Sequence, residues 1–300
     1  MDYEKLLADH KAKGADISIA TIPVNAKDAT GFGIMKVDKQ GMIDNFIEKP
    51  NSDLLPNWTS PVEEKYQAKG KKYLASMGIY LFNKSVLQKM FSDNPTANDF
   101  GKEIIPTAIT SEYKVASYAF GGYWEDIGTV SSFLEANLEL TEDIPSFDLF
   151  SSKNKVFTRA RMLPPTKVKK SMIDQVIIGE GAIIHNATVE RSVIGIRSRI
   201  EENTTIKNSI VMGIDKYESL TDIASIKAAS KKPHLGIGQN CYIENTIIDM
   251  NCAIGNNVTI RGGDNLEDIE TDTYCVRDGI IILKKGAVVL NNTLIGNAVS

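Results

Sequence analysis

Several features that mark particular protein classes are missing from this sequence of 300 residues. No apolar run approaches the roughly 18 residues that a membrane-spanning helix needs. Lysine and arginine number 34 against 38 aspartates and glutamates, which gives a net charge of −4 and no basic surface for nucleic acid. The opening stretch, MDYEKLLADHKAKG, lacks the apolar segment of a signal peptide. We therefore expect no membrane and no nucleic acid as partner.

Cysteine and histidine are also scarce. The cysteines Cys241, Cys252 and Cys275 are odd in number and have no CxxC spacing, which argues against a disulfide framework and a zinc site. The three histidines are scattered along the chain. Reduced thiols favour a cytoplasmic protein, or a plastid one if the source is a plant.

The length predicts two domains, at about 150 residues each. The first half alternates apolar strand patterns with helix patterns, which is typical of an α/β fold. We expect strands at 16–24, 33–38, 42–48, 73–82 and 114–120, helices at 3–13, 84–90, 100–109 and 129–140, and a long loop at 51–71. This domain is assigned to residues 1–150, and a proline-containing, basic linker to 151–170.

Beyond residue 170 the pattern changes. Apolar–glycine pairs recur about every 16 to 18 residues, and a single aliphatic residue follows about six positions after a pair. The pairs end at Gly179, Gly195, Gly213, Gly238 and Gly255, and the aliphatic residues are Ile184, Ile200, Ile206, Ile243 and Ile260. Such repeats are typical of a hexapeptide β-helix, whose coils bury their aliphatic residues only by stacking. We predict this domain at 171–300, with a charged excursion loop at 215–233.

Six stretches, in this order, resemble glucose-1-phosphate adenylyltransferase (ADP-glucose pyrophosphorylase). They are FGIMKVDKQGMIDNFIEKP (32–50), ASMGIYLF (75–82), NDFGKEIIP (98–106), GGYWEDIGTVSSFLEANLELT (121–141), RMLPPTK (161–167) and GIGQNCYIENTIID (236–249). The resemblance implies a Rossmann-like nucleotidyltransferase domain of the GT-A type, followed by a left-handed parallel β-helix. It also implies the conversion of ATP and glucose 1-phosphate into ADP-glucose and diphosphate in glycogen or starch synthesis, by a homo- or hetero-oligomer.

The sequence Glu48-Lys49-Pro50 ends a predicted strand, and strand ends are where α/β sheets present ligand sites. Lysine is a compact cation for phosphate oxygens, and glutamate accepts hydrogen bonds from sugar hydroxyls. Taken alone, an exposed Glu-Lys pair is more often a solvated surface. The resemblance implies that Glu48 and Lys49 bind glucose 1-phosphate, with Lys49 on the phosphate. The other expected pocket residues are Gly33, Ser76 and Trp124.

Asp126 lies close to the turn glycine Gly128. Its carboxylate can bind Mg²⁺ or cap the helix that follows, and the residues alone leave both readings open. The resemblance implies that Asp126 is catalytic, as one of two carboxylates that hold the Mg²⁺ ion. It also implies that Asp99 supports the sugar pocket.

Enzymes of this family that make ADP-glucose are regulated by phosphorylated metabolites. The resemblance implies that Arg161 and Lys285 bind such an effector. The string IIDKN of those enzymes reads IIDMN here, with Met250 in place of the lysine. A methionine cannot bind an anion through charge, so we expect activation by an acidic metabolite to be lost or to use other residues.

The glycine-rich loop that would bind the triphosphate is not found, since the glycines before residue 40 are Gly14, Gly31 and Gly33. The family's first metal-binding aspartate precedes the residues that match Met1–Tyr3. We therefore expect a truncated first domain and a chain that is inactive alone. One alternative is a non-catalytic regulatory or assembly subunit that acts through the β-helix. Another is a hexapeptide-repeat acyltransferase that uses His185, which the Glu-Lys-Pro and Trp-Glu-Asp clusters argue against.

Overall fold

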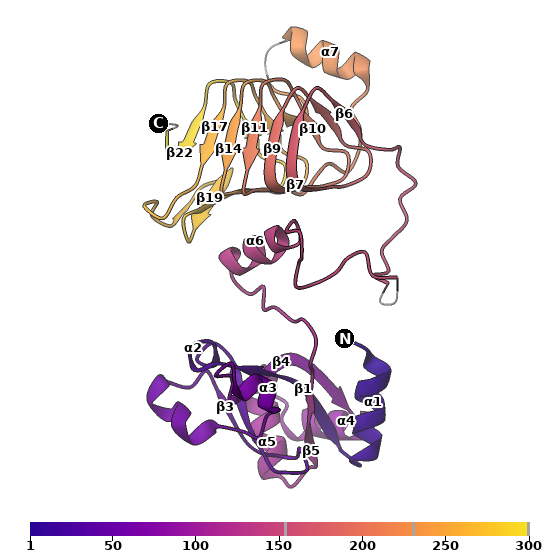
Figure 1. Cartoon of the computed structure of the whole chain (residues 1–300), viewed down its shortest axis with the longest axis vertical. Coiled ribbons are helices and arrows are strands. Elements are labelled where there is room, and N and C mark those ends of the chain that lie inside the picture. The colour runs from indigo at the N-terminus through magenta and orange to yellow at the C-terminus, as the bar shows by residue number, and fades with distance from the viewer. Residues whose placement is uncertain (153–154, 230–231, 299–300) are drawn as a thin grey trace. The chain divides into compact units, whose positions relative to one another are not determined.

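The computed structural model describes residues 1–152, 155–229 and 232–298. Contacts divide the chain into two units, Met1–Trp124 and Glu125–Ser300, and each is described by itself. Figure 1 shows the first as a sheet with helices around it and the second as a stack of coils. Helix α6 (Val130–Glu139) belongs to the second unit because Leu134 and Leu138 pack against isoleucines of the coils. The division therefore lies well before residue 150.

The first unit is built on a mixed sheet with the strand order β3-β2-β4-β1-β5. Its strands are β1 (Ile17–Val24), β2 (Gly33–Val37), β3 (Ile43–Glu48), β4 (Tyr73–Phe82) and β5 (Val115–Ala119). Neighbouring strands are antiparallel except β1 and β5, which are parallel. The helical segments are α1 (Tyr3–Ala12), α2 (Ala26–Ala29), η1 (Ser52–Trp58), α3 (Glu64–Gln67), α4 (Lys84–Asp93), η2 (Phe100–Ile104) and α5 (Ile105–Thr110).

The strands of this sheet send alternate residues to two separate apolar clusters, as the period of two in a strand requires. Ile17, Ile19 and Met35 face a cluster that α4, η2 and α5 complete with Met90, Ile104, Ile105 and Ala108. Ile34 and Ala75 face the other cluster, which α2 and η1 complete with Ala29 and Leu55. The predicted strands and helices of this half are present, so the α/β expectation is confirmed.

Two segments differ from expectation. The predicted loop at 51–71 contains η1, a 3-10 helix, and α3. Leu55 of η1 is buried at 2% exposure, so an apolar contact orders a segment whose composition is polar. The helix expected at 100–109 begins as one π-helical turn, η2, before α5 continues it.

The second unit is a parallel β-helix whose coils stack three columns of aliphatic side chains. The strands are β6 (Lys167–Lys169), β7 (Met172–Ile178), β8 (Ile183–His185), β9 (Thr188–Ile194), β10 (Arg199–Ile200), β11 (Thr205–Lys207), β12 (Ile210–Val211), β13 (Gly236–Ile237), β14 (Tyr242–Glu244), β15 (Thr246–Ile248), β16 (Ala253–Ile254), β17 (Thr259–Arg261), β18 (Ile269–Glu270), β19 (Tyr274–Arg277), β20 (Ile280–Leu283), β21 (Val288–Val289) and β22 (Leu294–Gly296). The columns are Ile184-Ile200-Ile237-Ile254-Val289, Val189-Ile206-Ile243-Ile260-Ile295 and Ile178-Ile194-Val211-Ile248-Leu283.

The isoleucines singled out by the repeat lie in these columns, and each is at most 1% exposed. One expected pair is different. Met212 is 39% exposed, and Val211 takes the inward position in its coil. The repeat there is thus displaced by one residue, which turns the methionine outward.

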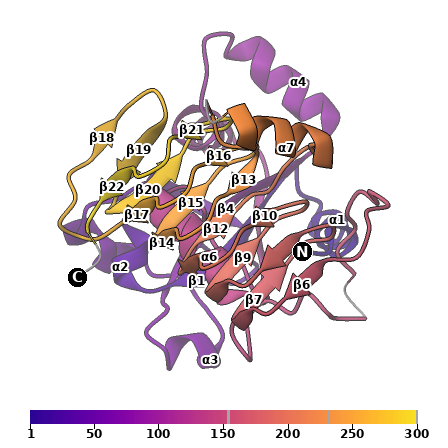
Figure 2. The same cartoon turned by 90° about the horizontal axis from the view of Figure 1, so that it is seen from above.

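Two insertions interrupt the repeat. The excursion at 215–233 contains α7 (Leu220–Ala229), which lies on the outer side of the coils in both Figure 1 and Figure 2. Residues 230 and 231 of the excursion lie outside the described part of the chain, as do residues 153 and 154 of the linker. The second insertion is the antiparallel pair of β18 and β19, which joins the sheet through β20. No helix in the described residues is long and apolar enough to span a membrane.

Replacing Ile243 by alanine is expected to lower the free energy of unfolding by about 3 kcal/mol, since it removes a fully buried side chain from the middle of a column. The control is Ile269→Ala, because Ile269 is 41% exposed and its loss is expected to cost under about 0.5 kcal/mol. Urea denaturation followed by circular dichroism compares the two. Equal effects of both substitutions would contradict the stacked core.

Candidate functional site

Gly33 and Glu48 form a cross-strand pair where β2 begins and β3 ends. Gly33 is buried, and a Cβ atom added to it would lie 2.4 Å from a Phe46 ring carbon and 2.8 Å from Oε2 of Glu48. The Glu48 carboxylate therefore occupies the space that any other side chain would need. The absence of a side chain at Gly33 thus lets the Glu48 carboxylate lie close to the backbone.

The same carboxylate reaches the start of η2. A Cβ atom added to Gly101 would lie 3.0 Å from Oε2 of Glu48 and 3.4 Å from Oδ1 of Asp99. Asp99 caps η2 by accepting a hydrogen bond from the backbone N–H of Lys102 at 2.8 Å. The carboxylates of Glu48 and Asp99 thus both lie close to Gly101, at the edge of the sheet.

Strand β4 brings two hydroxyl groups to this region. Its pairing with β1 shifts register, so that Thr21 pairs with Ser76 whereas Ile19 pairs with Tyr80. Gly78 within the bulge has φ +70°, a conformation that L side chains rarely adopt. The bulge places the Ser76 and Tyr80 oxygens 3.5 Å apart, and bulges are common beside functional sites.

Tyr80 and Phe100 are site residues that sequence reasoning missed. Burial raises the pKa of the Tyr80 phenol, the hydrogen bond to Ser76 lowers it, and the negative charges of Glu48 and Asp99 raise it. The Tyr80 ring stacks on Phe100 with centroids 5.5 Å apart. In the sequence, Gly78 between Ser76 and Tyr80 could have indicated the bulge that brings both hydroxyls together.

Lys49 and Trp124 both contact Phe32, the residue before Gly33. The backbone N–H of Lys49 donates to the Phe32 carbonyl at 3.0 Å, and Lys49 has φ +47°. Its side chain is exposed and has no carboxylate partner among the described residues. The Trp124 ring packs edge-on against the Phe32 ring, with centroids 5.6 Å apart. The structure thus brings Gly33, Glu48, Lys49, Ser76 and Trp124 to one edge of the sheet.

Asp126 belongs to the second unit and is exposed. Thr129, not Asp126, caps α6, through a capping box with Ser132. The Asp126 carboxylate lies over Gly128, where an added Cβ atom would be 3.2 Å from Oδ2. In the described part of the chain no three acidic, histidine or cysteine residues lie close enough together to hold a metal ion. Asp126 could therefore supply one ligand to Mg²⁺ but not a complete site.

The expected effector residues are both exposed. Arg161 lies before Leu163 in the segment that leads into the β-helix, and Lys285 lies in the turn before β21. At this turn the backbone N–H of Gly286 donates to the Met250 carbonyl at 2.9 Å, so Met250 and Lys285 lie on neighbouring coils. Lys284 pairs with Glu270 at 2.6 Å.

His185 is half-buried on β8, and its Nδ1 lies 3.1 Å from a Glu202 oxygen. His185 therefore has a structural role as the partner of a surface carboxylate, which explains its presence without a catalytic function.

Two protein-family models match the chain. The nucleotidyl transferase model matches residues 1–143, and the model of the GLGC left-handed parallel β-helix domain matches residues 161–294. The first stretch therefore matches a nucleotidyl transferase domain and the second a left-handed β-helix, as predicted. In this order the two matched domains have the architecture of glucose-1-phosphate adenylyltransferase.

Replacing Gly33 by alanine is expected to displace Phe46 and Glu48 and to cost about 1–3 kcal/mol of stability, as overpacking does. The matched control is Gly31→Ala, whose Cβ atom would meet only the Asp28 carbonyl oxygen at 3.4 Å. Denaturant midpoints measure both effects. A Gly33→Ala variant as stable as the control would show that the carboxylate is not held against this glycine.

Proposed function

We propose that the chain serves the glucose-1-phosphate adenylyltransferase reaction, in which ATP and α-D-glucose 1-phosphate give ADP-glucose and diphosphate. The observation that carries this proposal is the placement of the Glu48 carboxylate between Gly33 and Gly101, with the exposed Lys49 next in the chain. A fixed carboxylate beside an unpaired cation suits a ligand with hydroxyl groups at one end and a phosphate at the other.

Each residue at this edge has a role in binding. Glu48 accepts hydrogen bonds from sugar hydroxyls, while Ser76 and Tyr80 add hydroxyls that either donate or accept. The ring of Trp124 covers an apolar face of the sugar. Lys49 binds the phosphate and holds the oxygen that attacks the α-phosphorus of ATP, and a new P–O bond forms as diphosphate leaves.

Nucleotidyl transferases generally use Mg²⁺, which stabilises charge on the phosphates when bound. We propose Asp126 as one of its ligands, in accord with the resemblance noted above. Because the described residues do not form a complete metal site, the steps assigned to this chain are binding and orientation of the sugar phosphate.

We also propose an assembly of several copies, or of this chain with a related one, through the β-helix. Among the described strands, β6 pairs only with β8 and β22 only with β17, so each end of the stack has an open edge. An open edge is a template for pairing with another chain.

Replacing Lys49 by glutamine is expected to weaken binding of glucose 1-phosphate at least tenfold and to remove the preference for it over glucose, because the phosphate loses its cation. Glu48→Gln is expected to weaken the binding of glucose 1-phosphate and of glucose alike, because it changes the contacts to the sugar that both share. Isothermal titration calorimetry measures the affinities, with Lys39→Gln in the exposed β2–β3 turn as control. A chain that binds glucose 1-phosphate no better than glucose would refute the proposed site.

Formation of ADP-glucose from ATP, Mg²⁺ and glucose 1-phosphate tests the reaction itself.

Arg161 and Lys285 are proposed as the cations that receive a phosphorylated effector. Met250 leaves Lys285 without a second lysine on the neighbouring coil. Met250→Lys is therefore expected to strengthen binding of inorganic diphosphate at least threefold, and adding Lys285→Gln should reverse the gain. Met172→Lys, at an exposed methionine of β7, serves as control. An equal gain from the control would mean that general charge, not this turn, attracts the anion.

A further inference from the structure

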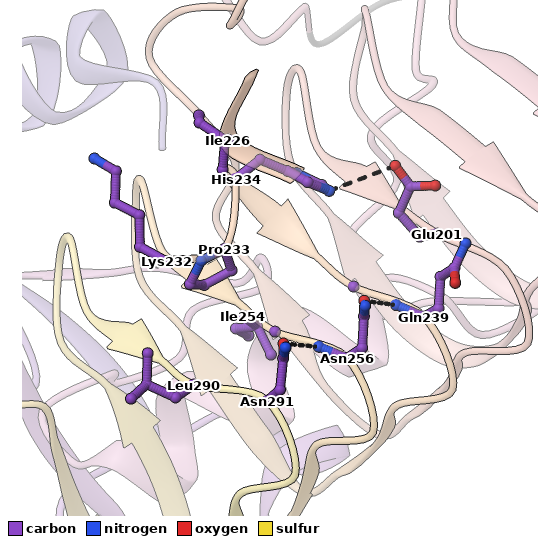
Figure 3. Close-up of a pocket in the computed structure, with 12 residues that line it drawn as sticks. Glu201, Ile226, Lys232, Pro233, His234, Gln239, Ile254, Asn256, Leu290 and Asn291 are labelled. Atoms are coloured by element: carbon purple, nitrogen blue, oxygen red, sulfur yellow. Dashed lines mark hydrogen bonds and ion pairs between the residues drawn. The ribbon is translucent and has the colours of Figure 1, made fainter. Parts of the chain in front are cut away.

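A cavity of about 440 Å³ lies on the outer side of the β-helix, beneath the excursion that carries α7. It shares no residue with the sites discussed above. Figure 3 shows Pro233, the last residue of the excursion, and His234 on one side and the coil residues Asn256 and Asn291 on the other. The volume lies within the range of pockets that hold small molecules.

One end of the cavity holds the carboxylate of Glu201, whose side chain is 12% exposed. His234 is 5% exposed, with Nδ1 2.9 Å from the Leu235 carbonyl oxygen and Nε2 3.6 Å from Oε1 of Glu201. Arg199 approaches the same oxygen at 3.7 Å. The Arg199 guanidinium attracts this carboxylate and the imidazole of His234 lies beside it, so Glu201 presents a charged acceptor at this end of the cavity.

A row of side-chain amides lies along the cavity. Oδ1 of Asn291 accepts from the backbone N–H of Asn256 at 2.8 Å, and Oδ1 of Asn256 accepts from that of Gln239 at 2.9 Å. Since the oxygens are used, each Nδ2 group remains as a donor, and neither has a protein partner within the described ranges. The row repeats from coil to coil, at about the 4.8 Å spacing of adjacent strands.

The rest of the lining is apolar, and the charges nearly balance. Ile226, Ile254 and Leu290 line the cavity, and Lys232 is at its rim in Figure 3. Among the described lining residues the Lys232 ammonium is balanced by the Glu201 carboxylate, so these residues carry no excess of positive charge to select an anion. Amide donors, a fixed acceptor and aliphatic walls together suit a neutral ligand with many hydroxyl groups and apolar C–H faces.

We propose that this cavity binds a neutral carbohydrate of two or three sugar rings. The Glu201 carboxylate accepts from hydroxyl groups, the amides of Gln239, Asn256 and Asn291 donate to hydroxyl oxygens, and Leu290 packs against a ring. The proposal concerns binding alone and does not depend on the function proposed above.

Titration of the full chain with maltotriose, by saturation-transfer NMR and calorimetry, tests the proposal. Saturable binding is expected, weakened at least tenfold by Leu290→Arg, which fills the cavity. Leu294→Arg is the matched control, since Leu290 is 57% and Leu294 56% exposed and only Leu290 lines the cavity. Gln239→Ala is a second variant, which removes one amide while its backbone N–H keeps the bond to Asn256. It is expected to weaken binding at least threefold and to leave glucose 1-phosphate binding unchanged.

Cellotriose and inorganic phosphate are the comparison probes. The proposal is overturned if neither trisaccharide binds at millimolar concentration, if Leu290→Arg and Leu294→Arg behave alike, or if phosphate binds in place of the trisaccharides. Tighter binding of either trisaccharide supports the carbohydrate class and identifies the preferred linkage.

Discussion

The β-helix depends on one constraint, which is that no single coil can bury its own aliphatic residues. Each coil contributes one residue to each of three columns, and the aliphatic residues of one coil are covered by those of its neighbours. Isoleucine and valine suit this arrangement because branched side chains pack well on a pleated surface. Stability in this unit is therefore a property of contacts between coils, and the loss of one column member affects its neighbours.

At the corners of the coils, asparagines hold neighbouring coils in the register that the stacked columns require. Asn186, Asn203, Asn240, Asn257 and Asn292 all have positive φ, and each of the first four side-chain amides donates to the oxygen of the next along the stack. Neighbours in this ladder are 17 residues apart except where the two insertions lengthen the interval to 37 and 35. The corners keep the coils in register, so an excursion such as that with α7 can form outside the stack without disturbing it.

The first unit uses a different device, a close approach of backbone and carboxylate. The Glu48 carboxylate fits here only because Gly33 and Gly101 have no side chains. The bulge in β4 requires positive φ at Gly78, which a glycine adopts readily. Oriented polar groups on a rigid sheet can recognise a ligand without reorganising, which favours binding. The same unit's apolar clusters, one on each side of the sheet, hold these strands in place.

Sequence alone determined the order of an α/β half and a β-helix, because alternation, repeat length and turn chemistry are local properties. It also indicated Gly33, Glu48, Lys49, Ser76 and Trp124, which the structure brings to one sheet edge although their roles remain predictions. Only the tertiary structure added Tyr80 and Phe100, joined α6 to the second unit, and placed His234 beside Glu201. The physical reason is that these arrangements depend on a strand bulge, on helix packing and on an insertion that folds back, each of which joins residues with no shared local pattern.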